Sequence, residues 1–364
     1  MIIEILTLLI ITRLLIFIIG YISVLVFSET RPAFFEIPNL FFKWDSNWYL
    51  QIAKEGYDNL TYIDNEYRSL VVFFPLYPML IRIFSFGFFN PKIIGFIISN
   101  VALVFASVYL YKLTKLEFKD KSLAIKSVFF MLIFPVSFFF SIFYTEGLFL
   151  ALAISCFYYA RKKQWLIASF LGFFLSLTRS IGFLIFIPML MEYLDLDFNA
   201  FKVKKEKVKK DILYLLLVPA GLIAYEICLW IKSKDPFVYF KAEAGWGRKL
   251  APIFDTFYIE LAKHHYYYQW IAVFTVIFVL LLIVHIYFSE LRLSYTIYSL
   301  ILFVLPISTT LAASIPRYCS VIFPIYISMA LISKKNKYLD YFLVIFSIAM
   351  LSLMTVIFVN AWLA

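Results

Sequence analysis

Glycine and charged residues are both scarce in this sequence of 364 residues. Only 10 residues are glycine and 15% are charged, whereas soluble domains have about 25% charged residues. The single Gly-x-Gly sequence, Gly245-Trp246-Gly247, has Leu250 in place of a third glycine, and no G-x-x-x-x-G-K-[ST] motif occurs. The sequence therefore disfavours nucleotide-binding loops, and with them soluble ATP or NAD chemistry.

Cysteine and histidine are rare as well. The three cysteines, Cys156, Cys228 and Cys319, lie in or beside apolar runs, so we interpret them as small hydrophobic residues and expect no disulfide framework. The pair His264-His265 has no cysteine or third histidine beside it, which argues against a zinc site. We expect no bound metal.

Hydrophobic residues, in contrast, make up 63% of the chain. About 20 apolar residues cross a bilayer as a helix. Hydropathy places such spans near residues 5–27, 91–111, 127–144, 146–160, 164–178, 181–194, 212–231, 270–288, 295–313, 318–333 and 339–361. The first is longer than a signal-peptide core, so we expect it to be retained. The sequence thus predicts an all-α polytopic membrane protein with about eleven transmembrane helices.

Basic residues are distributed unevenly between the predicted loops. With the N-terminus inside, the short inner loops hold eighteen of the 33 Lys and Arg residues, in accordance with the positive-inside rule. These basic residues are expected to set the topology of the chain, because anionic lipid of the inner leaflet attracts them. This explanation argues against nucleic-acid binding. The N-terminus is then cytoplasmic, and the two long polar segments, residues 28–90 and 232–269, face the extracytoplasmic side.

The four spans predicted between residues 127 and 194 are short. Three of them fall below the roughly 17 residues that cross a bilayer. Their outer turns, which contain Glu146 and Arg179, should therefore lie below the membrane surface, where irregular backbone needs surrounding protein or a water-filled cavity. We expect an outward-facing cavity with these two side chains at its floor.

The segment WDSNWYLQIAKEGY begins at Trp44. On a helix, Asp45 shares one face with Trp48 and Tyr49, and Gly56 is placed to end the helix. Asp45 has two interpretations. It caps the helix by accepting a bond from a backbone N–H, or it is a general base that takes a proton from an attacking hydroxyl.

Four other charged residues are predicted at or just below the outer face. Glu146 either complements the dipole of its helix or binds a sugar hydroxyl or an arginine. Arg179, Arg317 and Arg248 either extend to lipid headgroups or together clamp a phosphate, which guanidinium groups bind through paired hydrogen bonds.

Two aromatic residues adjoin these arginines in the sequence. Trp246 lies two residues before Arg248, and Tyr318 follows Arg317. They either stack on a sugar face or a prenyl chain, or anchor the chain at the membrane interface.

Several segments resemble the GPI mannosyltransferase II (PIG-V) family in order and spacing. They are WDSNWYLQIAKEGY, FFPLYPML, SNVALVFASVYLYKLT, PVSFFFSIFYTEGLFLALA, LSLTRSIGFL and IPRYCSVIFPIYISMAL, and they lie within roughly residues 40–333. The first is the most specific. The chain departs from the family pattern at Thr145-Glu146-Gly147, where Ser-Glu-Ser is common, and at Arg179-Ser180-Ile181-Gly182, where Arg-Ser-Asn-Gly is common.

The resemblance implies a GT-C type glycosyltransferase, which passes a sugar from a polyprenyl or dolichyl phosphate to an acceptor on the outer or lumenal side. In that family the acidic residue of the first outer loop is the expected base, and it maps onto Asp45. On this hypothesis the three arginines hold the leaving phosphate of an inverting displacement. Glu146, Trp44, Trp48, Tyr49 and Trp246 position the sugar and the acceptor.

The predicted function is therefore that of a mannosyltransferase-like membrane enzyme without a cofactor. Its expected partners are membrane lipids, the lipid-phosphate sugar donor and a glycolipid, glycan or protein acceptor. We expect a catalytic domain over residues 1–333, a C-terminal transmembrane helix within 334–364 and, since compact loops favour a prokaryotic protein, a plasma-membrane location. A transporter or lipid-linked sugar flippase is the alternative, although no internal repeat supports it. A third alternative is an assembly subunit without catalytic activity, but this function would leave Asp45 and the arginines unexplained.

Overall fold

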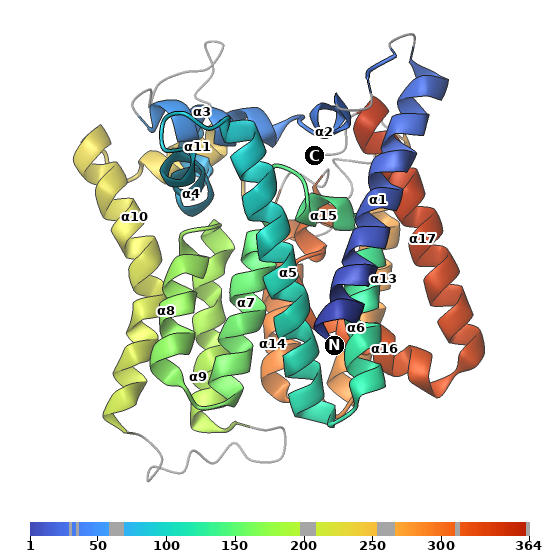
Figure 1. Cartoon of the computed structure of the whole chain (residues 1–364). Coiled ribbons are helices and arrows are strands. Elements are labelled where there is room, and N and C mark those ends of the chain that lie inside the picture. The colour runs from blue at the N-terminus through green and yellow to red at the C-terminus, as the bar shows by residue number, and fades with distance from the viewer. Residues whose placement is uncertain are drawn as a thin grey trace.

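The computed structural model describes residues 1–28, 31–33, 36–57, 69–196, 209–252, 266–309 and 314–361. Within these ranges the regular structure is helical, apart from one isolated bridge between Leu250 and Thr309. The long helices pack side by side into one bundle, and short helices lie across one end of it (Figure 1). The predicted all-α fold is confirmed.

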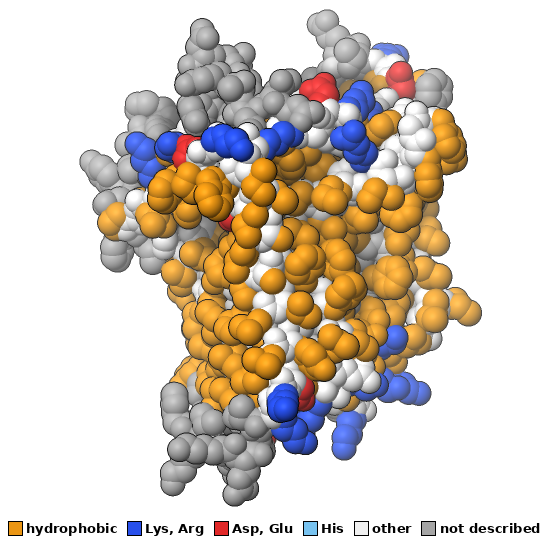
Figure 2. Space-filling view, turned by 90° about the vertical axis from the view of Figure 1, so that its left-hand side faces the viewer, with side chains coloured by type: hydrophobic (Ala, Val, Ile, Leu, Met, Phe, Trp, Pro, Cys, Tyr) orange, Lys and Arg blue, Asp and Glu red, His pale blue; other side chains and the backbone are white. Residues whose placement is uncertain are grey.

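Five helical segments are long and apolar enough to cross a membrane. They are α1 (Ile2–Phe27), α5 (Pro91–Phe118), α10 (Leu217–Ser233) with the 3₁₀ turn Lys210–Leu216 before it, α13 (Tyr266–Phe288) and α17 (Lys337–Asn360). On the face shown in Figure 2, hydrophobic side chains cover the middle of the bundle and Lys and Arg side chains collect at its two ends. An apolar surface of this extent marks an integral membrane protein.

Shorter helices complete the bundle. They are α6 (Lys121–Ile133), α7 (Glu146–Arg161), α8 (Trp165–Ser176), the 3₁₀ turn Ser180–Ile185 with α9 (Phe186–Leu194), α14 (Leu293–Ile307) and α16 (Pro324–Lys335). Each of the eleven predicted spans thus contains a helix. In Figure 1, α7 and α8 end below the layer of short helices.

Two of the predicted spans are interrupted by proline. The helix expected over 127–144 ends at Ile133, because Pro135 lacks an N–H and favours an extended conformation at Phe134, whose φ and ψ are −56° and 143°. The chain then continues as a 3₁₀ turn, Ser137–Phe140. The helix expected over 318–333 is divided in the same way, because α15 (Ile315–Cys319) ends before Pro324 starts α16.

The short helices lie together at one end of the bundle, which we call the site end (Figure 1). They are α2 (Ile37–Leu40), α3 (Asp45–Glu55), the 3₁₀ turn Leu70–Val72, α4 (Leu76–Ser85), α11 (Val238–Gly245) and α15. The described parts of the two long polar segments predicted from hydropathy therefore share one end. Helix α4 has only 10 residues and exposes Met79, Ile83 and Phe84, which suits a helix at the membrane interface.

A buried arginine in α1 supports the interrupted helix. Arg13 is only 4% exposed, and its guanidinium donates to the carbonyl oxygens of Leu132 at 2.5 Å and Ser137 at 2.6 Å. These carbonyls lie where α6 stops, so the arginine satisfies backbone acceptors that the helix leaves open. Our sequence analysis missed this residue, although a single charge within an apolar span is a recognised indication of a specific partner.

The last helix, α17, packs against α1 and against the segment before α3. Asn360 Nδ2 donates to Ser23 Oγ at 3.0 Å, and the Lys43 ammonium donates to the carbonyl oxygen of Val359. Phe358 is completely buried and contacts Phe138 and Phe139. The C-terminal helix thus helps to hold the segment that leads into the candidate active site.

Candidate active site

The candidate site starts at the N-terminus of α3. Trp44 adopts a positive φ of 55°, a conformation that costs on the order of 1–3 kcal/mol for a residue other than glycine. This turn places Asp45 as the first residue of the helix. The helix ends as predicted, because Gly56 follows Glu55 with a φ of 73° that glycine adopts without penalty.

The carboxylate of Asp45 binds an arginine from a distant part of the chain. Arg317 Nη1 donates to Asp45 Oδ2 at 2.6 Å, and the two side chains are 7% and 21% exposed. The helix-capping interpretation of Asp45 is wrong, since Trp44 occupies the capping position and its side chain makes no capping bond. The carboxylate faces a second functional group instead of its own backbone.

Glu146 begins α7 and is completely buried. Its Oε1 accepts a hydrogen bond from Arg179 Nη1, and Arg317 Nε lies 3.2 Å from the same oxygen as an ion pair. Its Oε2 is buried and has no hydrogen-bond partner among the described residues. Glu146 therefore complements its helix dipole and binds two arginines at once.

Gly147 permits the tight turn at this point. A Cβ atom there would lie 2.5 Å from the carbonyl oxygen of Phe140 and 3.1 Å from that of Ser99, which is too close for any larger side chain. The departure from the Ser-Glu-Ser pattern thus has a local reason: the backbone passes directly against α7 at this glycine.

The three predicted arginines converge on one aromatic ring. The guanidinium carbons of Arg179, Arg248 and Arg317 lie 4.9, 5.1 and 5.3 Å from the centroid of Tyr318, within the range of cation–π contacts. Arg248 Nη2 also donates to the Tyr318 hydroxyl. Arg179 and Arg317 are 10% and 7% exposed, so the prediction that they extend to lipid headgroups is wrong.

Arg248 is the least neutralised of the three cations. Arg317 pairs with Asp45 and Arg179 pairs with Glu146, whereas the nearest carboxylate to Arg248 in the described part of the chain is that of Glu243, 3.9 Å away. Burial lowers the pKa of Arg248, the carboxylates of Glu243 and Asp45 raise it, and the neighbouring cations Arg317 and Arg179 lower it; the net shift is downward. Arginine stays protonated despite such shifts, so the cluster presents positive charge that suits an anion.

Aromatic side chains surround the charged cluster. Trp48 and Trp246 pack edge to face at 5.7 Å, and Tyr49 packs in the same way on Phe73 at 5.2 Å and on Tyr77 at 5.5 Å. Trp246 Nε1 donates to the carbonyl oxygen of Ser69 at 3.0 Å. This contact holds the two polar segments together.

Trp44 and Tyr49 differ in accessibility. Trp44 is 36% exposed beside Asp45, whereas Tyr49 is buried within the aromatic cluster. Trp44 is therefore placed to contact a ligand, and Tyr49 to support the helix that carries Asp45.

The structure brings all the predicted site residues to the site end. The His264-His265 pair lies outside the described residues. Among the described residues, no group of three or more His, Cys, Asp or Glu side chains is placed to hold a metal ion.

The fold is that of a GT-C type membrane glycosyltransferase. It superposes on the crystal structure of the apo oligosaccharyltransferase of Archaeoglobus fulgidus with a TM-score of 0.51 and 14% identity, over 99% of this chain and 56% of that chain. The same enzyme tethered to an acceptor peptide gives a TM-score of 0.50 and 14% identity, over 98% and 55%. The chain thus spans about half the length of these structures. No curated relative matches the sequence.

The chain belongs to the mannosyltransferase (PIG-V) family, whose model matches residues 33–242. This range contains Asp45, Glu146 and Arg179 and ends before Arg248 and Arg317. The family resemblance is confirmed, and with it the assignment of the chain to the glycosyltransferases. The motif around Arg317 lies outside the matched range, but the structure joins it to Asp45.

Proposed function

We propose that this protein transfers a mannose-like sugar from a polyprenyl or dolichyl phosphate donor to a hydroxyl of a glycolipid, glycan or protein acceptor. The observation that carries the proposal is the buried network of Asp45, Glu146, Arg179 and Arg317, which joins four distant segments at the site end. Buried charges in a membrane protein are expensive and are retained mainly for function.

In the proposal the three arginines hold the donor phosphate. Guanidinium groups match the geometry of phosphate oxygens, and fixed donors in a dry site stabilise the charge that develops as phosphate leaves. Arg248 has the most uncompensated charge, so it meets the phosphate first. A site of this kind needs neither a nucleotide-binding domain nor an organic cofactor, and the guanidinium groups supply the positive charge without a metal.

Asp45 is the proposed general base. The acceptor hydroxyl oxygen forms a bond to the anomeric carbon while the bond from that carbon to the phosphate oxygen breaks, and the phosphate departs with the electron pair. The hydroxyl proton passes to Asp45, and the configuration of the sugar inverts. When the donor phosphate engages Arg317, it competes with the Asp45 carboxylate for the guanidinium, and this frees the carboxylate oxygen to accept the hydroxyl proton.

The remaining predicted residues position the reactants. The unpartnered Oε2 of Glu146 accepts a hydrogen bond from a sugar hydroxyl. Trp44, which is exposed beside Asp45, contacts the acceptor, while Trp48, Tyr49 and Trp246 form the aromatic wall behind it. The proposal places the site end outside the cytoplasm, because the lysine-rich short loops connect helices at the other end. The membrane is then the plasma membrane of a prokaryotic cell, as the compact loops favour.

Sugar transfer from radiolabelled polyprenyl-phosphate mannose in proteoliposomes tests the proposal. Replacing the base, Asp45→Asn, should lower kcat by about 10²–10⁴-fold. Asp235→Asn is the matched control: Asp235 also pairs with a base, Lys241, at 2.6 Å, but it lies in the loop before α11. Retention of full activity by a folded Asp45→Asn protein would rule out the mechanism.

A further inference from the structure

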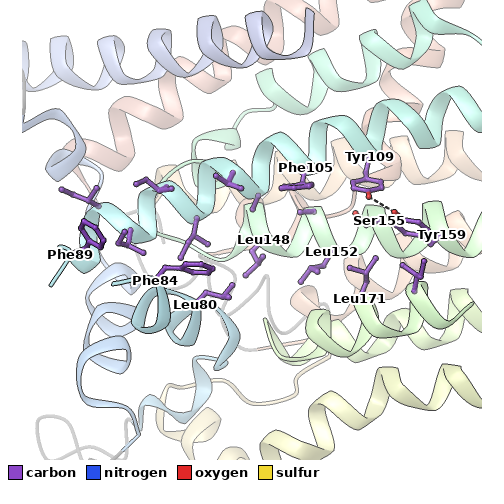
Figure 3. Close-up of a pocket in the computed structure, with 18 of the residues that line it drawn as sticks. Leu80, Phe84, Phe89, Phe105, Tyr109, Leu148, Leu152, Ser155, Tyr159 and Leu171 are labelled. Carbon is purple, nitrogen blue, oxygen red and sulfur yellow. Dashed lines mark hydrogen bonds between the residues drawn. The ribbon is translucent and has the colours of Figure 1, made fainter. Parts of the chain in front are cut away.

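A long apolar groove of about 940 Å³ lies on the membrane-facing side of the bundle, between α4, α5, α7 and α8 (Figure 3). Its volume is at the upper end of the usual range for ligand sites. Asn90, Ser155, Tyr109 and Tyr159 are the polar residues in its lining. The groove is therefore suited to a hydrocarbon chain and not to a sugar or a peptide.

The groove extends through most of the bilayer. Its lining along α5 runs from Asn90 to Tyr109, and a helix rises about 1.5 Å per residue, so the groove is roughly 28 Å long. The hydrocarbon core of a bilayer is about 30 Å thick, and each leaflet supplies about half of it. An acyl chain from one leaflet would fill only about half of the groove, whereas a polyisoprenoid chain could fill all of it.

The two ends of the groove differ. At the site end, Phe84 of α4 and Phe89 line the opening, and both are exposed. At the other end, the hydroxyl groups of Tyr109 and Tyr159 are hydrogen-bonded at 2.9 Å (Figure 3). A chain can thus enter at the interface beneath α4 and extend inward until it meets the two tyrosines.

The helices that line the groove also carry the charged site. Glu146 starts α7, and Leu148, two residues later, lines the groove and packs against the aromatic cluster that contains Tyr49. Leu171 of α8 lines the groove, and Arg179 follows the same helix. The groove thus shares two helices with the charged site, and its opening lies at the same end of the bundle as the phosphate-binding arginines.

We propose that this groove holds the isoprenoid chain of the sugar donor. The inference rests on the proposed function, since it assigns the lipid part of the donor whose phosphate the arginines bind. The chain lies along α5 and α7 with its phosphate at the site end. A groove of this length favours long polyprenyl donors over short ones. Each isoprene unit that moves from the bilayer into the groove makes further van der Waals contacts with the groove walls.

The kinetic test compares mannosyl donors that carry undecaprenyl and farnesyl phosphate. We expect wild-type protein to prefer the undecaprenyl donor through a lower KM. Ser155→Trp places a large side chain near the inner end of the groove, so it should lower the undecaprenyl-to-farnesyl ratio of kcat/KM by about tenfold or more. Ile223→Trp, on the exposed face of α10, is the control and should leave the ratio unchanged. A wild-type protein that uses the two donors equally would overturn the proposal.

Photocrosslinking tests the site without requiring transfer. Undecaprenyl phosphate with a photoactivatable group at the end of its chain should label peptides from α5 and α7 around Tyr109 and Ser155, and excess undecaprenyl phosphate should reduce the labelling. Labelling elsewhere, or competition by phospholipid alone, would contradict the proposal. Labelling of the groove in a protein that transfers no sugar would support the lipid site and reject the proposed reaction, so the two failures can be distinguished.

Discussion

Two clusters of charged side chains lie at opposite ends of the bundle, and they differ in how completely their polar atoms are paired. The site-end cluster contains Asp45, Glu146, Arg179, Arg248 and Arg317. The second cluster, which we call the inner network, contains Glu117, Arg161, Glu192, Asp195 and Arg292. Both join segments that are far apart in the sequence, so connectivity alone does not separate a structural cluster from a ligand site.

Ion pairs and hydrogen bonds join all the members of the inner network. Arg161 contacts Glu117 at 2.5 Å and Glu192 at 3.1 Å, and Arg292 contacts Glu192 at 3.1 Å. Tyr295 donates to Glu117 at 2.9 Å, and Ser294 donates to Glu192. Glu117 and Glu192 thus each receive bonds from both α7 and α14, as expected for a cluster that holds helix ends together.

The site-end cluster, in contrast, has unfilled bonding capacity. Glu146 Oε2 and Arg317 Nε are buried without hydrogen-bond partners among the described residues, whereas no side-chain atom of the inner network is in that position. Unpaired buried polar groups are costly. The difference is consistent with the proposal that the inner network stabilises the fold and that a ligand completes the site-end cluster.

The largest predicted effect is the loss of folding stability when the inner network is broken. Glu192→Ala would leave Arg161 and Arg292 without their shared carboxylate, and we expect the free energy of unfolding to fall by about 3–5 kcal/mol. Thermal unfolding in detergent measures the change. Asp195→Asn is the control, since the Asp195 side chain is 50% exposed and its loss should cost about 1 kcal/mol or less. If Glu192→Ala lowered kcat of the folded protein and spared stability, the comparison between the clusters would fail.

An intermediate effect is expected at the site end. Arg317→Lys replaces a guanidinium that contacts Asp45 and Glu146 together, and an ammonium cannot reproduce this planar geometry. We expect sugar transfer to fall by about 10²–10³-fold, with a smaller loss of stability than in Glu192→Ala. The matched change at the other end, Arg292→Lys, should reduce stability and leave kcat almost unchanged. Equal effects of both changes on transfer would contradict the assignment.

The smallest effect is expected at Tyr318. Tyr318→Leu removes the ring shared by three guanidinium groups. If the lost cation–π contacts are worth about 1–2 kcal/mol of donor binding, the donor KM should rise by about tenfold. Tyr318→Phe keeps the ring and loses only the hydroxyl that Arg248 binds, so its effect should be smaller. Tyr295→Phe is the control in the inner network, where a hydroxyl bound to Glu117 is lost, and the donor KM should not change. A larger loss with phenylalanine than with leucine would show that the ring is unimportant.

Much of the candidate site could be predicted because its parts are local. The helix that carries Asp45 follows from the spacing of its aromatic residues and from Gly56, and the depth of Glu146 and Arg179 follows from the short spans beside them. The partners could not be predicted. No sequence pattern indicates that Arg317 would bind Asp45 from 272 residues away, or that three arginines would share the ring of Tyr318.

The inner network shows the opposite error. Arg161 and Arg292 were counted among the basic residues that set topology, yet each pairs with buried Glu192. A loop charge and a buried charge look alike in a sequence, because burial depends on which other helix ends arrive at the same place. The interruption at Pro135 was also missed, although its steric cause is local.

Composition and hydropathy alone determined that this chain is helical and lies in a membrane, because the cost of an unpaired backbone in lipid allows few other solutions. Local motifs determined which residues are candidates for chemistry. Only the tertiary structure decided which charges are satisfied and which remain available, and where a hydrocarbon chain can lie. These properties depend on distances between side chains that are remote in sequence, and packing of the whole bundle sets those distances.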